Sequence, residues 1–247
     1  MNRAYLQIYL YTIIFSFLAS LSAKIGIIYS LSKENVSSNA ILRFISGLAT
    51  GLILGIVFLF LCPHSDNTIQ SNYSWLLIGI VIFLAIDGYL SNPLGFSKGK
   101  DERMPSRGIK IFFCQIIINM SCGAALAVGF KMRLMKGIFL AFGIILYQFP
   151  RSIINLNKLK NNWSFRSSII GAFLSPFTIP IGTVIALFLL NASIVPASLI
   201  GAVYGITIGL LIYIGISDII RRTDTCPSSI AFGIGVVTAL LIRTLSL

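Results

Sequence analysis

The sequence predicts an all-α fold, a polytopic membrane bundle of about eight transmembrane helices in a single domain covering residues 1–247. The first observation is composition: 56% of the 247 residues are hydrophobic and 11% are charged, whereas soluble globular domains carry roughly 25% charged residues. The second is that the apolar residues gather in stretches close to the roughly 20 residues that a helix needs to cross a bilayer. Each stretch is expected to be helical, since backbone groups in lipid must be hydrogen-bonded internally.

The apolar stretches give the order of the predicted spans. They cover residues 5–31, 39–61, 75–92, 109–130, 136–157, 167–190, 195–219 and 228–245. The first follows a positively charged start, but no convincing small-residue cleavage site comes after it, and it is therefore predicted to be a span rather than a signal peptide. The polar segment 96–110 is expected to form a solvated loop that separates three spans from five.

Basic residues are distributed unevenly between the two predicted sides of the membrane. Five lie on the side of the termini: Arg3, Lys131, Arg133, Lys136 and Arg243. Twelve lie on the other side: Lys33, Arg43, Lys98, Lys100, Arg103, Arg107, Lys110, Lys158, Lys160, Arg166, Arg221 and Arg222. The positive-inside rule therefore places both termini outside the cytoplasm and the 96–110 loop inside it, in a cell membrane of the inner or plasma type.

This topology explains the net charge of +12, because the cations lie between apolar runs. The lipid bilayer is the predicted partner, and nucleic acid is not. The four cysteines, Cys62, Cys114, Cys122 and Cys226, show neither zinc-site spacing nor a disulfide framework, and no cofactor is expected. An integral-membrane enzyme is disfavoured, since the chain has one histidine and no acidic cluster accompanies its loop cations.

Two of the predicted spans carry the same ladder of small residues. The ladders are Gly47, Gly51 and Gly55 in the second span and Gly201, Gly205 and Gly209 in the seventh. A four-residue spacing places glycines on one helix face and lets two helices approach closely. Such a face is typical of membrane helix packing in general, and it also fits a homodimer through the glycine-rich spans. Its recurrence favours an inverted repeat that relates spans 1–3 to spans 6–8.

Polar residues inside apolar spans are candidates for a transport path, because they are costly in hydrocarbon. Lys24 and Asp87 lie near span ends, where their side chains can reach the aqueous rim. The remaining candidates lie in the fourth, fifth and seventh spans: Asn119, Ser121, Cys122, Tyr147, Gln148, Pro150, Arg151 and Asp218. The alternatives are hydrogen-bonding glue between helices in the fourth span and, for Arg151 and Asp218, a position at a helix end.

Two windows in these spans resemble the ZIP (Zrt/Irt-like) family of metal transporters. That family has an HNxPEG signature on its fourth span and HExPEG or HNxPEG on its fifth, where this chain has INMSCG at 118–123 and YQFPRS at 147–152. The flanking segments, the span count, the outside termini and the loop after the third span are similar as well. The resemblance covers nearly the whole chain, and it implies a ZIP-like bundle of eight spans.

The family's metal ligands are mostly replaced in this sequence. Asn119, Gly123 and Pro150 match the signatures, whereas the other signature positions do not. Ile118 and Tyr147 stand where the family has histidines, and Cys122 and Arg151 stand where it has carboxylates. Gln148 stands where the family has Glu or Asn. Phe60 and Ile179 replace the acidic residues of the second and sixth spans, whereas Asp218 retains the acidic residue of the seventh.

The resemblance therefore implies a divergent ZIP-like protein that lacks the usual binuclear metal site. Electrostatic repulsion between a guanidinium and a dication about 4 Å apart amounts to about 8 kcal/mol at an effective dielectric constant of about 20. Arg151, which would replace a ligand carboxylate, can pair with Asp218 or bond Asn119 and Gln148. The protein would then be a non-classical or regulatory transporter subunit, or would carry an anionic or polar small solute. The alternative is a divalent metal (zinc- or iron-type) uptake transporter with an altered site of, at best, Asn119, Cys122, Gln148 and Asp218.

Overall fold

The computed structural model describes residues 3–32, 40–58, 72–91, 105–191, 197–220 and 226–245. Almost all of them are helical and none is in a strand, which confirms the all-α prediction. The elements are α1 (Arg3–Ser32), α2 (Ala40–Ile56), α3 (Asn72–Ser91), α4 (Pro105–Met132), α5 (Leu134–Lys160), α6 (Phe165–Leu174), the 3₁₀ turn η3 (Ser175–Phe177), α7 (Thr178–Asn191), α8 (Ala197–Ile220) and α9 (Cys226–Leu245).

Helix length and composition fit a multi-pass membrane protein. Four helical segments are long and apolar enough to cross a bilayer: Gln7–Ser32, Arg107–Met132, Leu134–Lys160 and Phe165–Leu190. Four shorter apolar helices accompany them: Ala40–Ile56, Ser74–Ala85, Ala202–Ser217 and Ser229–Leu241. Large hydrophobic side chains such as Val81, Phe188 and Ile230 are exposed on the outside of the bundle, as expected of surfaces that face lipid.

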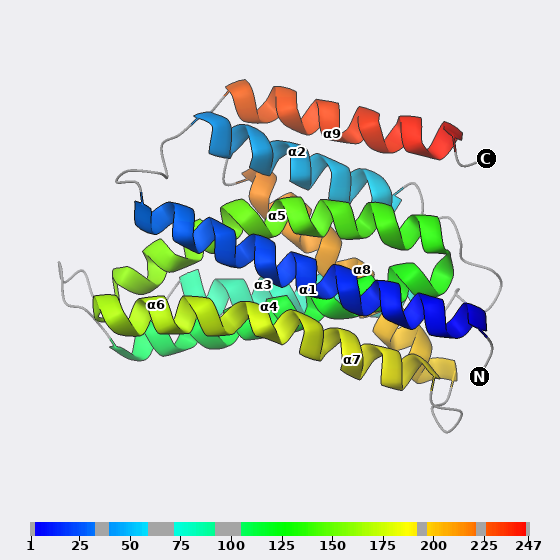
Figure 1. Ribbon diagram of the computed structural model, residues 1–247, viewed down its shortest axis with the longest axis horizontal. Coiled ribbons are helices and arrows are strands. Elements are labelled where there is room, and N and C mark those ends of the chain that lie inside the picture. Colours follow the sequence, from blue (N-terminus) through cyan, green and yellow to red (C-terminus); the bar gives the residue numbers. More distant parts are fainter. Residues whose placement is uncertain are drawn as a thin grey trace.

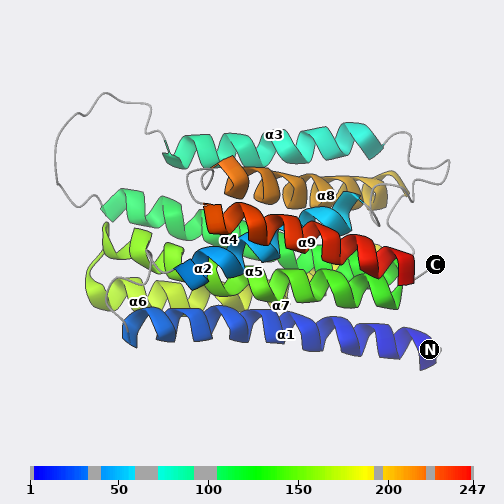
Figure 2. The ribbon, with the colours of Figure 1, turned by 90° about the horizontal axis from the view of Figure 1, so that it is seen from above.

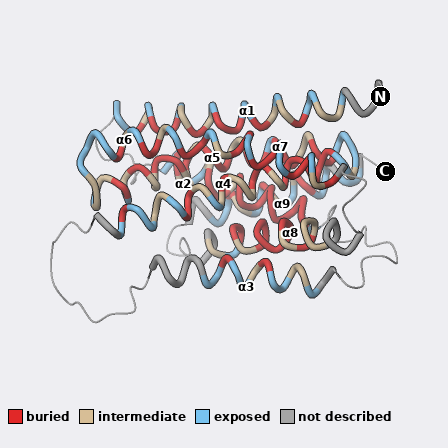
Figure 3. Tube along the Cα trace, turned by 90° about the horizontal axis from the view of Figure 1, so that it is seen from below, coloured by how far each residue is buried: buried red, intermediate tan, exposed pale blue. Residues whose placement is uncertain are grey.

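The helices lie side by side along one long axis (Figure 1). The start of α1 and the end of α9 lie at the same end, and the end of α3 and the start of α4 lie at the opposite end (Figure 2). Burial is concentrated where α4, α5, α2 and α8 meet, whereas α1 and α3 present exposed outer faces (Figure 3). Residues 96–104 of the predicted loop are outside the described part of the chain.

Helices α4 and α5 form the central pair, and a single residue connects them. Arg133 has an extended backbone, with φ −161° and ψ 144°, between Met132 and Leu134. The Arg133 amide donates to Gly129 O, and the Gly137 amide donates to Arg133 O at 3.0 Å. Because Gly137 has no Cβ, the Phe130 ring packs directly onto its backbone. The two helices therefore form a tight antiparallel hairpin.

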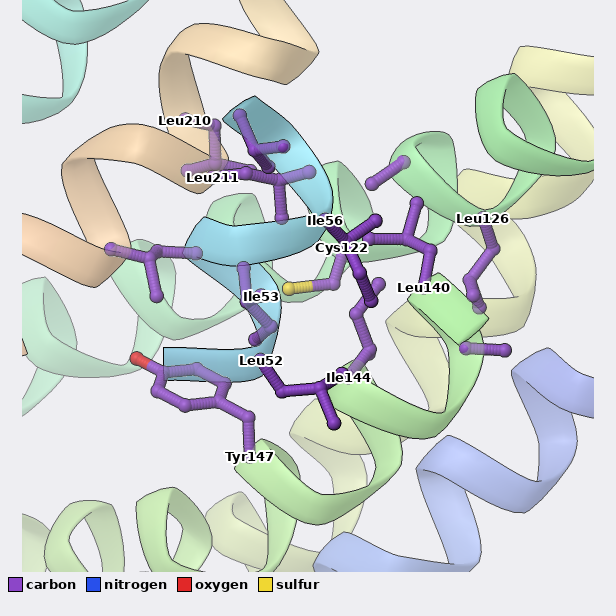
Figure 4. Packing of buried hydrophobic residues seen from close by; sticks show 14 of the residues in the cluster. Leu52, Ile53, Ile56, Cys122, Leu126, Leu140, Ile144, Tyr147, Leu210 and Leu211 are labelled. Carbon is purple, nitrogen blue, oxygen red and sulfur yellow. The ribbon is translucent and has the colours of Figure 1, made fainter. Parts of the chain in front are cut away.

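The outer helices pack on this hairpin and on one another in definite pairs. The most extensive contacts join α2 to α9, α3 to α8, α1 to α5, and α4 to α7. The main apolar core lies where α2, α4, α5 and α8 meet, and Ile53, Leu126, Ile144 and Leu210 are among its fully buried members (Figure 4).

The sixth predicted span, 167–190, is interrupted rather than continuous. Helix α6 ends at Leu174, the 3₁₀ turn Ser175–Phe177 follows, and α7 begins at Thr178. Pro176 explains the interruption, since it has no N–H to donate and its ring clashes with a continuing helix. Helix α5, in contrast, continues through Pro150. The interruption lies close to the middle of the segment Phe165–Leu190.

Glycines allow the close approach of two of the outer pairs. Gly51 of α2 lies against the Phe232 backbone of α9, and Gly235 of α9 lies against the Leu48 carbonyl of α2. In the other pair, Gly79 of α3 and Gly209 of α8 each lie against the partner's backbone. The predicted close packing of the glycine ladders is thus used within the chain at Gly51 and Gly209; a homodimer through these spans stays a prediction.

Replacing Gly51 with leucine is expected to lower thermal stability, because the new side chain would overlap the Phe232 backbone. Overpacking of this kind costs about 1–3 kcal/mol. Gly233→Leu on α9 is the matched control, since a Cβ there meets nothing within 4 Å. The measurement is the melting temperature of each purified variant in detergent. Equal losses in the two variants would contradict the α2–α9 contact.

Candidate functional site

Three buried carboxamides gather where α4 and α5 face the interruption of the sixth span. Asn119 and Gln148 are 0% and 1% exposed, and Gln115 is buried as well. Asn119 Oδ1 accepts from Gln148 Nε2 at 3.5 Å and from Gln115 Nε2 at 3.4 Å, while Asn119 Nδ2 donates to the Ser175 carbonyl at 2.9 Å. Asn119 and Gln148 lie close to the middle of their apolar segments. Asn119 is therefore the centre of a cluster that joins three helices.

The Ser175 carbonyl is available to Asn119 because the helix is broken there. A turn of 3₁₀ geometry leaves backbone groups that no longer have their α-helical partners. Ser175 O accepts from Asn119 Nδ2 and also from Thr178 Oγ1 at 2.6 Å. Farther along, Thr183 Oγ1 lies 3.1 Å from the Gly123 carbonyl of α4 and 3.1 Å from the Ile179 carbonyl of its own helix, and its single hydroxyl proton is shared between them. Asn119 and Thr183 thus make polar contacts between the interrupted span and α4.

Arg151 and Tyr147 form a second polar feature of α5, beside Gln148, which Arg151 follows by three residues. Arg151 Nη1 donates to Tyr147 Oη at 2.8 Å, and the guanidinium carbon lies 5.2 Å from the centroid of the Tyr147 ring. Tyr147 belongs to the main apolar core, where its ring lies near Leu52 and Ile53 of α2 (Figure 4). A partly buried arginine is thus held by a tyrosine one helical turn nearer the middle of the span.

The remaining predicted residues lie in different surroundings. Ser121 donates to the Ile117 carbonyl of its own helix at 2.8 Å. Cys122 is buried in the apolar core with Tyr147 (Figure 4). Pro150 is also buried. The Asp218 side chain lies outside the described residues, so its predicted pairing with Arg151 stays a prediction.

Lys24 reaches the interruption of the sixth span from α1. Its ammonium lies 3.4 Å from the centroid of the Phe177 ring, which is a cation–π contact. Nearby on α1, Ser22 Oγ donates to the Ile145 carbonyl of α5 at 2.7 Å. Lys24 therefore contacts another helix from its place in the span. The side chain of Asp87, the other charge predicted near a span end, is outside the described part.

The donor set of the site suits hydrogen bonding better than metal binding. Within the described ranges, no three His, Cys, Asp or Glu side chains come together. Asn119, Gln148 and Gln115 offer neutral amides, and both polar atoms of the Asn119 carboxamide are engaged within the cluster. Divalent zinc prefers imidazole, thiolate and carboxylate ligands. The cluster can therefore join helices, while Arg151 is the permanent charge at the site.

Sequence reasoning missed Gln115 and Asn155. Gln115 is four residues before Asn119, which puts both side chains on one face of α4, and this spacing was a usable signal. Asn155 follows Arg151 by four residues in the same way. Its Nδ2 atom is buried and has no hydrogen-bond partner among the described residues.

Asn119→Leu is expected to destabilise the protein by about 1–3 kcal/mol, because it leaves the Gln148 amide without its Asn119 bond and removes the donor that ties the Ser175 carbonyl to α4. Ser121→Ala on the same helix is the control, since Ser121 bonds only a carbonyl of its own helix among the described contacts. Thermal unfolding in detergent measures both variants. A loss for Asn119→Leu no larger than that for Ser121→Ala would contradict the role of Asn119 in holding the interrupted span.

Comparison of the sequence with protein-family models and with curated proteins finds no match.

Proposed function

We propose that the protein is a multi-pass membrane transporter of a small polar solute, with eight spans in a ZIP-like arrangement and without the usual binuclear metal site. The observation that carries the proposal is Arg151, held by Tyr147 inside an apolar helix of the central pair. Ionisable residues within spans are expensive and commonly mark solute pathways. The proposal involves no catalysis and no cofactor, and it places both termini outside the cytoplasm.

The helix pairing supports an inverted repeat of spans 1–3 and 6–8, with α6, η3 and α7 together as the sixth span. In this repeat, α1, α2 and α3 correspond to α7, α8 and α9, and α4 corresponds to α5. The α2–α9 contact then corresponds to the α8–α3 contact, and the α1–α5 contact corresponds to the α7–α4 contact. The glycine contacts follow the same exchange: Gly51 packs on α9 as Gly209 packs on α3. Equivalent helices run in opposite directions (Figure 2). Repeats of this kind are common in transporters, whose solute sites lie near the midplane.

The interrupted sixth span supports a transporter more than a rigid scaffold. Discontinuous helices near the bilayer midplane are typical of transporter binding sites, because their breaks present backbone groups to a cavity. Here the break at Ser175–Phe177 faces Asn119 of α4 and Lys24 of α1.

The charges argue against a divalent cation as the solute. Between Glu102 and Asp218 the sequence has no Asp or Glu, and α4 to α7 therefore carry cations alone. A dication that approached Arg151 to about 4 Å would meet a repulsion of about 8 kcal/mol at an effective dielectric constant of about 20. Nothing in the carboxamide cluster offsets this cost, because amides are neutral. A neutral or anionic solute fits the site better.

Zinc handling tests this part of the proposal. We expect purified protein to carry less than one zinc per chain by elemental analysis, and we expect zinc uptake into proteoliposomes no faster than into empty liposomes. Cys122→Ala and Arg151→Gln provide the diagnostic comparison. Zinc uptake that Cys122→Ala abolishes and Arg151→Gln preserves would instead establish a metal transporter with an altered site.

A solute path also predicts that water reaches position 151. In a background with the four native cysteines replaced, Arg151→Cys is expected to react with a membrane-impermeant thiol reagent. Ile144→Cys on the same helix is the matched control, because Ile144 is 0% exposed in the apolar core. Mass spectrometry measures the labelled fraction. Protection of both cysteines from both sides of the membrane would contradict a path past Arg151.

A further inference from the structure

Cations from two separate parts of the chain gather at one end of the bundle. The start of α4, the end of α5 and the start of α6 lie at this end (Figure 2). The exposed cations are Arg107 and Lys110 of α4, Lys158 of α5 and Arg166 of α6. Lys160, in the last turn of α5, is partly buried. We call these five residues the basic end surface.

Trp163 joins the two parts of this surface. It lies in the turn between α5 and α6, where its backbone N–H donates to the Leu159 carbonyl at 2.8 Å. Its ring lies against Gly108 of α4 and Gly171 of α6, and the ring centroid is 5.8 Å from that of Phe112 on α4. A side chain at Gly108 would overlap the indole. The start of α4, with its cations, is therefore held beside the α5–α6 turn.

Exposed apolar side chains continue from these cations along α4 and α6. On α4, Phe113 and Ile117 follow Lys110 by three and seven residues. On α6, Ile170 follows Arg166 by four residues. Such spacings place each set on one helix face, and the three apolar side chains are 42% to 60% exposed. Each helix thus presents a stripe that has a cation at its polar end and apolar side chains beyond it.

Helix stabilisation does not explain the positions of the two arginines. Arg107 and Arg166 lie in the first turns of α4 and α6, where the helix dipole disfavours a positive charge. On the side of the membrane where the sequence places this surface, the chain has twelve Lys and Arg and six Asp and Glu, an excess of six positive charges. The positive-inside rule accounts for cations at this end, but it requires neither their assembly around Trp163 nor the exposed apolar stripes.

We propose that the basic end surface binds the headgroups of anionic phospholipids, whose acyl chains lie along the exposed stripes of α4 and α6. Arginine matches a phosphodiester because its planar pair of N–H groups can bond two oxygens at once. Polybasic segments beside membrane helices attract anionic lipids, and tryptophan commonly lies at the level of the headgroups. The stripes favour a lipid over a free phosphate, since only the lipid has chains that cover them. This inference is independent of the proposed transport function.

Lipid binding to the full-length protein in a neutral detergent tests the proposal. The melting temperature is followed while phosphatidylglycerol, or phosphatidylcholine with the same acyl chains, is added. We expect phosphatidylglycerol to raise it saturably and at a lower concentration than phosphatidylcholine. Each cation beside an anionic headgroup contributes about a factor of five to affinity. Arg107→Gln combined with Arg166→Gln is therefore expected to weaken the apparent affinity for phosphatidylglycerol about tenfold or more.

A matched control separates this surface from general effects of charge. Arg133→Gln combined with Arg243→Gln removes two exposed arginines at the opposite end of the bundle, and it is expected to keep the wild-type affinity. Lys110→Gln combined with Lys158→Gln is expected to weaken binding as the first variant does. It serves as the test if size-exclusion profiles show that the arginine variant does not fold.

Three outcomes would overturn the proposal. The first is that phosphatidylglycerol has no advantage over phosphatidylcholine, or that the control variant weakens binding as much as Arg107→Gln with Arg166→Gln. The second is that glycerol 3-phosphate, a soluble headgroup, raises the melting temperature at the same concentrations, which would establish a free-phosphate site instead. The third concerns Trp163→Ala, which keeps all five cations and is expected to weaken binding because it releases the start of α4. Unchanged affinity in that variant would contradict the assembled surface.

Discussion

The architecture depends on one constraint, which is that backbone groups at the middle of a membrane must find their partners within the protein. Most of the chain meets it with continuous helices. The sixth span does not, because Pro176 interrupts it at Ser175–Phe177. The Ser175 carbonyl receives its hydrogen bonds from Thr178 on the same span and from Asn119 on α4. Donors of the sixth span itself satisfy the break, and the carboxamide of Asn119 adds a partner from a second helix.

This use of Asn119 divides the polar residues of the central hairpin into two groups. The carboxamides face the interrupted span, and both polar atoms of Asn119 are engaged in hydrogen bonds there. Arg151 and Tyr147 instead bond to each other, with Tyr147 in the apolar core that α2 and α8 share. The two groups are neighbours on the helix surface, because Arg151 follows Gln148 by three residues, so a change at Arg151 is expected to reach the Asn119 cluster.

The sequence predicts much of this arrangement, because each signal rests on strong physical preferences. Apolar length identifies the helices, and polar residues in apolar runs identify Asn119, Gln148 and Arg151. The glycine spacing identifies a close-packed face. It does not identify the helix that packs there, which is α9 for Gly51 and α3 for Gly209, because that depends on the tertiary structure. The interruption at Pro176 was visible as the motif SPFTIP, yet proline also occurs at 150, where α5 continues. Asn155 was overlooked because it precedes the polar helix end, where an asparagine is unremarkable until its burial is known.

The single residue between α4 and α5 limits how the molecule can move. One residue of chain spans at most about 3.6 Å, so neither helix can slide far along the other. Phe130 seated on Gly137 further locks their register. We therefore expect α4 and α5 to keep their positions relative to each other if the α2–α9 and α3–α8 pairs move against them. In the transport function proposed above, such a movement would keep Arg151 at a fixed height in the membrane while water reaches it from alternate sides.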